Sequence, residues 1–173
     1  NKIFKKIFIQ PASGDAGISY GAALVEHFKN SNNKNNFYDK DFYLGSRFTN
    51  LEIKKALKKY KKKIKFKYHK DIAKVSAEII SKKKILGWFQ GGAEFGPRAL
   101  GNRSILCQPY PQGMKDYINK KVKFREHFRP FAPAILSENS KEYFYLNQDS
   151  DHMLIATKVK PNKKKIIAAT VHT

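Results

Sequence analysis

The stretch EFGPRALGNRS, residues 94–104, decides how this chain is interpreted. An apolar run at 85–89 precedes this stretch, and a second run, 103–108, begins at its last two residues. We therefore expect a strand at 85–89, a glycine-rich loop at 90–102 and a second strand at 103–108. Pro97 stiffens the loop, while Gly96 and Gly101 let backbone amides face inward. Arg98 and Arg103 carry the only positive side chains of residues 85–114.

Two fixed arginines on such a loop predict a phosphate or carboxylate ligand. Ser104 could add a hydroxyl donor and Asn102 an amide. An alternative is that Glu94 neutralises one arginine and the loop only caps the sheet. The sequence contains neither a Walker loop nor a Rossmann fingerprint, which excludes the usual nucleotide-binding motifs.

A second loop, KFREHFRPFAP at residues 123–133, has two more arginines, Arg125 and Arg129. Arg129 is the better ligand candidate because a proline follows it. Three phenylalanines interleave with these arginines: Phe124, Phe128 and Phe131. They could be core residues or the floor under an adenine, and we expect most of them to be core.

The net charge of +21 over 173 residues is unevenly distributed. Ten lysines lie within residues 54–70, without an acidic residue among them, and this pattern favours a solvated surface over a nucleic-acid footprint. Residues 7–28, 85–114 and 124–140 contain no lysine, yet they hold nine of the ten glycines and four of the five arginines. We therefore expect the chemistry in these three stretches.

The remaining elements alternate between strands and helices. We expect a helix at 17–29 with Tyr20, Leu24 and Phe28 on one face, and a Thr49–Glu52 capping box opening a helix that turns Ile53, Leu57 and Tyr60 inward. A helix near 70–84 should bury Ile72, Val75, Ile79 and Ile80. Further helices are expected at 112–122 and 138–145, and strands at 3–9, 131–136, 152–159 and 166–171. This order predicts an α/β fold with a mixed sheet.

Other features narrow the class of protein. No apolar run approaches the roughly 20 residues of a membrane span, and the amino terminus has no leader pattern, so we expect a soluble protein without a membrane partner. A single cysteine, Cys107, fits the reducing cytoplasm and a small core residue. The polar stretch 30–41 is predicted to be a linker. We expect the chain to be truncated at both ends.

Two segments carry a family resemblance: GWFQGGAEFGPRALGNRSIL at 87–106 and INKKVKFREHFRPFAPAIL at 118–136. They resemble the carboxy-terminal region of O-carbamoyltransferases of the nodulation-protein-U and cephem-carbamoyltransferase type. PASGDAGISYGAAL at 11–24 resembles the end of that family's first domain. The resemblance covers roughly residues 7–29 and 42–173. At Gly92-Ala93 many members carry a bulkier arginine-containing pair instead.

The resemblance implies a two-domain enzyme. Residues 42–173 would form a YrdC-like domain, a mixed twisted β-sheet flanked by helices, which joins carbamoyl phosphate and ATP into carbamoyl adenylate. Residues 1–29 would be a strand-turn-helix strip of an actin/hexokinase-superfamily domain, which passes the carbamoyl group to a hydroxyl of a sugar or secondary metabolite. Without the missing N-terminal domain, we expect this fragment to be inactive or partly active.

The residues and the resemblance together give a set of candidate site residues. The catalytic candidates are Arg98, Arg103, Ser104 and Arg129, and the candidates for binding nucleotide or carbamoyl phosphate are Gly96, Gly101, Asn102, Asn119, Lys123 and Arg125. ATP is expected with Mg²⁺, for which Glu94 is a weak ligand candidate. Asp15 would join an iron-type metal site only with ligands absent from this chain; alternatively it caps the following helix.

A function of another class stays open: a basic RNA-binding module of YrdC-like fold. That hypothesis predicts salt-sensitive binding at Lys54–Lys70. The carbamoyltransferase hypothesis predicts instead that ATP or carbamoyl phosphate stabilises the protein through the two arginine loops, residues 94–104 and 123–133. It expects no nucleic-acid partner.

Overall fold

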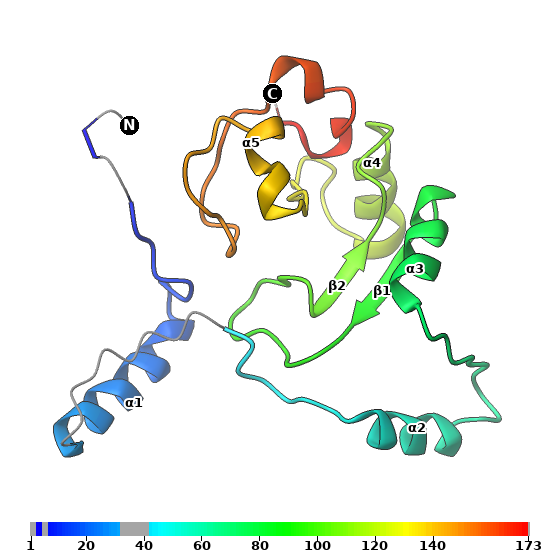
Figure 1. Ribbon diagram of the computed structural model, residues 1–173, viewed down its shortest axis with the longest axis horizontal. Coiled ribbons are helices and arrows are strands. Elements are labelled where there is room, and N and C mark those ends of the chain that lie inside the picture. The colour runs from blue at the N-terminus through cyan, green and yellow to red at the C-terminus, as the bar shows by residue number, and fades with distance from the viewer. Residues whose placement is uncertain (1–2, 5–6, 32–41, 173) are drawn as a thin grey trace. The chain divides into compact units, whose positions relative to one another are not determined.

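The computed structural model describes residues 3–4, 7–31 and 42–172. By its internal contacts the chain divides into two compact units, residues 1–70 with 87–104 and residues 71–86 with 105–173. The elements, shown in Figure 1, are helices and a small sheet, so the fold is mixed α/β. No helix of the described residues is long and apolar enough to cross a membrane.

Helix α1 (Ala16–Asn30) matches the predicted helix, and its expected face is half-buried at Tyr20, Leu24 and Phe28. The Tyr20 ring lies 5.7 Å from the Phe42 ring and 6.0 Å from the Phe95 ring, measured between centroids. These aromatic contacts pack α1 against Phe42 and against Phe95 of the glycine-rich loop. The predicted linker 30–41 lies outside the described residues from residue 32 onward, and the predicted domain boundary stays a prediction.

Helix α2 (Asn50–Lys59) begins with the predicted capping box. The Thr49 hydroxyl accepts from the Glu52 amide at 3.3 Å, and the Glu52 carboxylate accepts from the Thr49 amide at 2.7 Å. The expected inward face is wrong at Ile53 and Tyr60, which are exposed, and only Leu57 is half-buried. The hydrogen bonds of a helix cap form within one turn of the helix itself. Burial of a helix face requires a second element packed against that face, and the spacing of apolar residues does not provide one.

Strands β1 (Leu86–Phe89) and β2 (Arg103–Leu106) pair antiparallel, as Figure 1 shows, and confirm the two strands that enclose the loop. The other predicted strands are wrong in the described residues. The carboxy-terminal part instead has one bridge, between Phe144 and Val159, and 3-10 turns at Pro161–Lys163 and Ala168–Thr170. Within 131–136, Pro133 has no amide hydrogen to donate to a strand ladder.

Residues 42–46 run beside the start of the arginine loop and are joined to it through the backbone. The Phe95 amide donates to the Phe42 carbonyl at 2.7 Å, and the Gly45 amide donates to the Ala93 carbonyl at 2.8 Å. The approach requires glycine: a Cβ on Gly92 would lie 2.5 Å from the Tyr43 carbonyl oxygen. The loop is therefore anchored on both sides of Glu94, at Ala93 and at Phe95.

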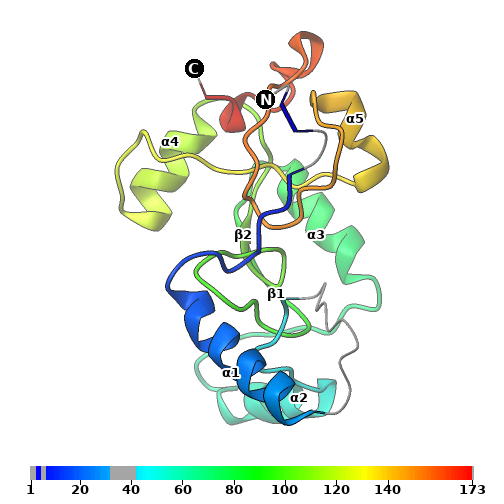
Figure 2. The same cartoon turned by 90° about the vertical axis from the view of Figure 1, so that its left-hand side faces the viewer.

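The second unit has a small core around α4 (Met114–Ile118) and the π-helical turn Asn119–Lys123 that continues it, confirming the predicted helix at 112–122. Figure 2 lets the reader follow the chain from α4 into the next loop. The buried core residues are Met114, Ile118 and Ala169, packed against Ile85, Cys107, Val122 and Phe131. Cys107 is therefore the core residue that was expected.

Two further helices complete the second unit. Helix α3 (Ile72–Ser81) half-buries Val75, Ile79 and Ile80, whereas Ile72 is exposed, contrary to prediction. The predicted helix at 138–145 forms as a 3-10 turn, Ser137–Asn139, followed by α5 (Ser140–Tyr143).

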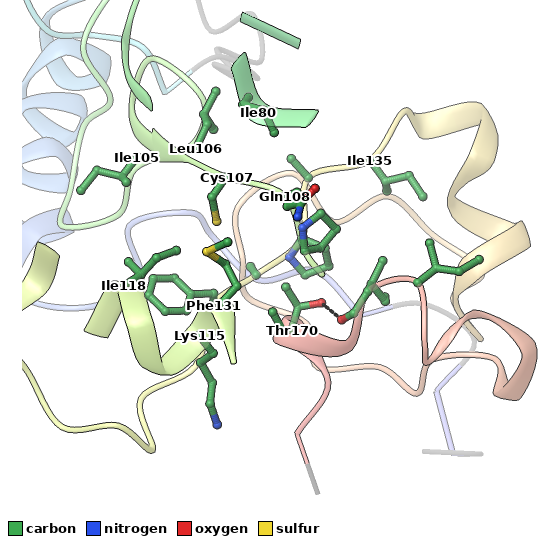
Figure 3. Close-up of a pocket in the computed structure, with 18 of the residues that line it drawn as sticks. Ile80, Ile105, Leu106, Cys107, Gln108, Lys115, Ile118, Phe131, Ile135 and Thr170 are labelled. Atoms are coloured by element: carbon green, nitrogen blue, oxygen red, sulfur yellow. Dashed lines mark hydrogen bonds between the residues drawn. The ribbon is translucent and has the colours of Figure 1, made fainter. Parts of the chain in front are cut away.

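A cavity of about 410 Å³ borders the core of the second unit. In Figure 3 the Lys115 amine points away from the apolar residues that line this cavity.

We predict that Gly92→Ala destabilises the protein by about 1–3 kcal/mol, because the added Cβ must displace the Tyr43 carbonyl. Gly87→Ala is the matched control, since a Cβ there meets nothing within 4 Å. Urea denaturation measures both variants. Equal stabilities of the two variants would contradict the close approach of residues 42–46 to the loop.

Candidate functional site

The arginine loop is organised around the carboxylate of Glu94, a residue only 4% exposed. One carboxylate oxygen accepts backbone amides of Leu100 at 2.7 Å, Asn102 at 2.7 Å and Arg103 at 3.1 Å. The other accepts the Arg103 Nε–H at 2.7 Å. Arg103 also donates through Nη2 to the Glu94 carbonyl at 2.7 Å. One buried carboxylate thus closes a loop of ten residues.

The protonation of Glu94 follows from these contacts. Burial by itself raises the pKa of Glu94, but the hydrogen bonds from the Arg103 side chain and from the amides of Leu100 and Asn102 outweigh burial and lower the pKa to about 2. The carboxylate is therefore charged near neutral pH. With four donors already bound, its oxygens are engaged in loop closure, and this argues against Glu94 as a magnesium ligand.

The other polar groups of the loop also serve the loop itself. The Asn102 side chain donates to the Gly92 carbonyl at 2.6 Å, and the Ser104 hydroxyl accepts the Gly101 amide at 3.1 Å. The amides of residues 100–103 thus face inward, as expected, and both Gly96 and Gly101 have a positive φ, of 94° and 109°. They face Glu94 and Ser104, however, and not an external anion.

Arg98 is the exception in this loop. It is exposed, and the part of the chain that the structure describes provides no ion-pair partner for it. It lies between Pro97, which fixes φ, and the segment 100–103 that Glu94 holds. Of the two alternatives drawn from the sequence, neutralisation by Glu94 describes Arg103, and anion binding remains available to Arg98.

The second arginine loop is held by Asn119, which is fully buried. Its side-chain amide donates to the carbonyls of Arg129 at 2.9 Å and His127 at 3.2 Å, and its side-chain oxygen accepts from Arg125 Nε at 2.7 Å. The Asn119 carbonyl also accepts the Arg125 amide at 3.0 Å. Asn119 therefore fixes the shape of the loop rather than facing a ligand.

Arg125 also helps to hold the second arginine loop in shape. Its guanidinium carbon lies 4.7 Å from the centroid of the Phe131 ring, a cation–π geometry, and Nη2 donates to the Pro130 carbonyl at 3.4 Å. Arg129 is different. It makes a 3.7 Å ion pair with Glu126 in which both side chains are at least half-exposed, and such pairs contribute little stability. Arg129 and the exposed Lys123 are thus the cations of this loop that can turn to a ligand.

The three phenylalanines separate in the structure. Phe131 is half-buried against the core, as expected, but Phe124 is 83% exposed and Phe128 is 68% exposed, so the expectation that most are core is wrong. Phe124 also has φ of 47°, the left-handed conformation usually taken by glycine after a helix. That conformation costs a residue with a side chain about 1–2 kcal/mol.

The candidate residues thus form two sets. The first unit brings together Gly96, Arg98, Gly101, Asn102, Arg103 and Ser104, and the second brings together Asn119, Lys123, Arg125 and Arg129. Sequence reasoning gave Glu94 as a possible partner of one arginine, which is confirmed for Arg103, but it missed that the same carboxylate binds three backbone amides. It gave Asn119 as a ligand candidate and missed that Asn119 holds the second loop. The signal for Glu94 was its position as the one carboxylate beside two arginines; Asn119 offered no such signal.

Asp15, the metal candidate, precedes α1 and is exposed. Within the described residues its side chain makes no capping hydrogen bond, so the alternative of a helix cap is wrong. The described residues contain no group of three His, Cys, Asp or Glu side chains that could hold a metal ion.

Burial raises the pKa of the Cys107 thiol, which favours its neutral form in the core.

Residues 77–173, which include both β-strands and both arginine loops, match the model of the family described as carbamoyltransferase C-terminus. The chain belongs to this family. The resemblance seen in the two loop motifs is thereby confirmed, and it applies to the carboxy-terminal region of the family's members.

Known relatives agree with the family match. The chain is 45% identical over 164 residues to an uncharacterized protein of Synechocystis, covering 91% of this chain and 26% of that protein. It is 38% identical to nodulation protein NolNO of Sinorhizobium fredii and 37% identical to nodulation protein NolO of Bradyrhizobium diazoefficiens. Each of these two matches covers 98% of this chain, and 26% and 32% of the relative. The chain thus spans about a quarter to a third of these relatives.

We predict that Glu94→Gln lowers the free energy of unfolding by about 3 kcal/mol at pH 7, because it removes the charge that binds Arg103. The folded-state pKa lies below the ordinary value of 4.5, so this stabilisation is present above about pH 4.5 and is lost as the pH falls toward 2. Urea denaturation at pH 7 and pH 3 should show a smaller difference from wild type at pH 3. Glu78→Gln, on the exposed side of α3, is the control, and a pH-independent effect of Glu94→Gln would count against the carboxylate.

We predict that Asn119→Ala destabilises the protein by about 2–4 kcal/mol, because the carbonyls of His127 and Arg129 and the Arg125 side chain lose a buried partner. Asn119→Asp should also be destabilised, since a carboxylate cannot donate to carbonyls. Melting temperatures measure both. The exposed Asn139→Ala is the matched control, and a wild-type melting temperature for Asn119→Ala would refute the role of Asn119 in holding the loop.

Proposed function

We propose that this chain is the carboxy-terminal part of an ATP-dependent O-carbamoyltransferase. In this proposal the enzyme converts carbamoyl phosphate and ATP to carbamoyl adenylate and passes the carbamoyl group to a hydroxyl of a sugar or secondary metabolite. Membership of the carbamoyltransferase C-terminus family supports carbamoyl transfer in general. The observation that carries the proposal is Arg98, an exposed cation on a loop that a buried carboxylate holds in shape.

The proposed division of labour follows from the contacts of each residue. Arg98 and Arg129, with Lys123, would neutralise the oxygens of carbamoyl phosphate and ATP, where charge moves during adenylation. Arg103 keeps 41% of its side chain exposed and could add one contact beside its ion pair. The remaining candidates would act by fixing the two loops; they are Gly96, Gly101, Asn102, Ser104, Asn119 and Arg125. No acid–base residue is required, since positioning and electrostatics dominate transfers at phosphorus.

The remaining parts of the proposal concern what lies around this chain. A YrdC-like fold for residues 42–173 and an actin/hexokinase-superfamily strip at 1–29 would make the rest of the longer protein the partner that completes the acceptor site. Mg²⁺ would arrive with ATP, held mainly by phosphate oxygens. Asp15, exposed before α1, would ligate an iron-type metal only together with residues of that other part. A cytoplasmic location fits the use of ATP.

We predict that millimolar MgATP or carbamoyl phosphate raises the melting temperature of the chain, because a ligand at 100 times its Kd stabilises the folded state by about 2.7 kcal/mol. Arg98→Ala and Arg129→Ala should abolish the shift, which differential scanning fluorimetry measures.

Lys58→Ala, on the exposed lysine-rich side of α2, is the control and should keep the shift. A shift that survives Arg98→Ala but disappears in Lys58→Ala would instead favour the basic module that binds RNA.

A further inference from the structure

Phe124 combines two features that are each unfavourable for folding. Its backbone is left-handed, with φ of 47° and ψ of 52°, and its side chain is 83% exposed. Glycine would relieve the first and a polar residue the second. Neither packing nor local propensity therefore explains a phenylalanine at this position, and strained residues of this kind cluster at ligand sites.

The surroundings of Phe124 hold it in place. It ends the π-helical turn Asn119–Lys123, and its amide donates to the Asn119 carbonyl. The next residue, Arg125, is held by the Asn119 side chain at 2.7 Å and lies over the Phe131 ring. The Phe124 ring is thus carried by a fixed backbone although the described residues leave most of its surface open to solvent.

The same loop supplies positive charge close in sequence to this ring. Lys123 precedes it, and Arg129, whose ion pair with Glu126 is long and exposed, follows five residues later. An open aromatic face combined with exposed cations suits a ligand that has both a planar ring and phosphates. A nucleotide has both, whereas carbamoyl phosphate lacks a ring.

We propose that Phe124 is the stacking face for the nucleobase of the nucleotide. This inference rests on the proposed function and specifies which part of the ligand the second arginine loop takes: the base stacks on Phe124, and the phosphates face Lys123 and Arg129. The ring lies at the end of the π-helical turn and is 83% exposed, so a planar ligand can reach it.

The test compares MgATP with magnesium tripolyphosphate, which has the phosphates but no base, by calorimetric titration of the 173-residue chain. Wild type should bind MgATP more tightly than tripolyphosphate. Phe124→Gly and Phe124→Asn, both of which tolerate a left-handed backbone, should weaken MgATP binding roughly 5- to 150-fold, the range for one stacked base, and leave tripolyphosphate binding unchanged. Phe124→Trp should retain MgATP binding, and Phe124→Gly should melt no lower than wild type.

Tyr68→Ala is the matched control, because Tyr68 is an aromatic residue that is 85% exposed in the other unit. Unchanged MgATP binding in Phe124→Gly and Phe124→Asn would overturn the inference while leaving the proposed function intact. An equal loss of tripolyphosphate binding would overturn it too, since the ring would then only shape the loop. Failure of wild type to bind either ligand would overturn the proposed function itself.

Discussion

The buried carboxylate of Glu94 is the constraint on which the first arginine loop depends. A charge with 4% exposure is tolerated only when donors surround it, and three backbone amides and one guanidinium do so here. The chain must return on itself to bring residues 100–103 to residue 94, which explains the positive φ at Gly96 and Gly101. Arg98 is carried on the turn so formed.

Asn119 holds the second loop in shape as Glu94 holds the first, but with a neutral side-chain amide in place of a charge. This difference affects which groups of each loop are left to bind a ligand. The amides of Leu100, Asn102 and Arg103 bind Glu94 and are not available to an incoming anion. In the proposed function the charge of a ligand at the first loop is therefore met mainly by the Arg98 side chain. In the second loop Asn119 binds the carbonyls of His127 and Arg129, and the one ion pair of the Arg129 side chain within the described residues is a weak pair with Glu126.

The sequence correctly predicted the parts of the fold that depend on residues close together in the chain. The Thr49–Glu52 capping box, α1 and the two strands around the loop depend on residues a few positions apart, or on a hairpin-like return. The expected strands at 131–136 and 152–159 depend on distant partners, and alternation alone does not supply a neighbouring ladder. For the same reason the sequence could name four arginines but not their roles: Glu94 binds Arg103, nine residues on, because the loop turns back.

Composition is therefore a partial guide to ligands. Arginine concentrates in the lysine-free segments largely because its planar fork holds loops together: Arg103 grips Glu94, and Arg125 joins Asn119 to the Phe131 ring. Lysine, a compact charge on a flexible stem, cannot reproduce these geometries. The presence of arginine thus marks the built loops, whereas the groups that we propose to face a ligand are those that the loops leave exposed. Arg98, Arg129 and Phe124 share this property, because the buried contacts that hold their loops do not use their side chains.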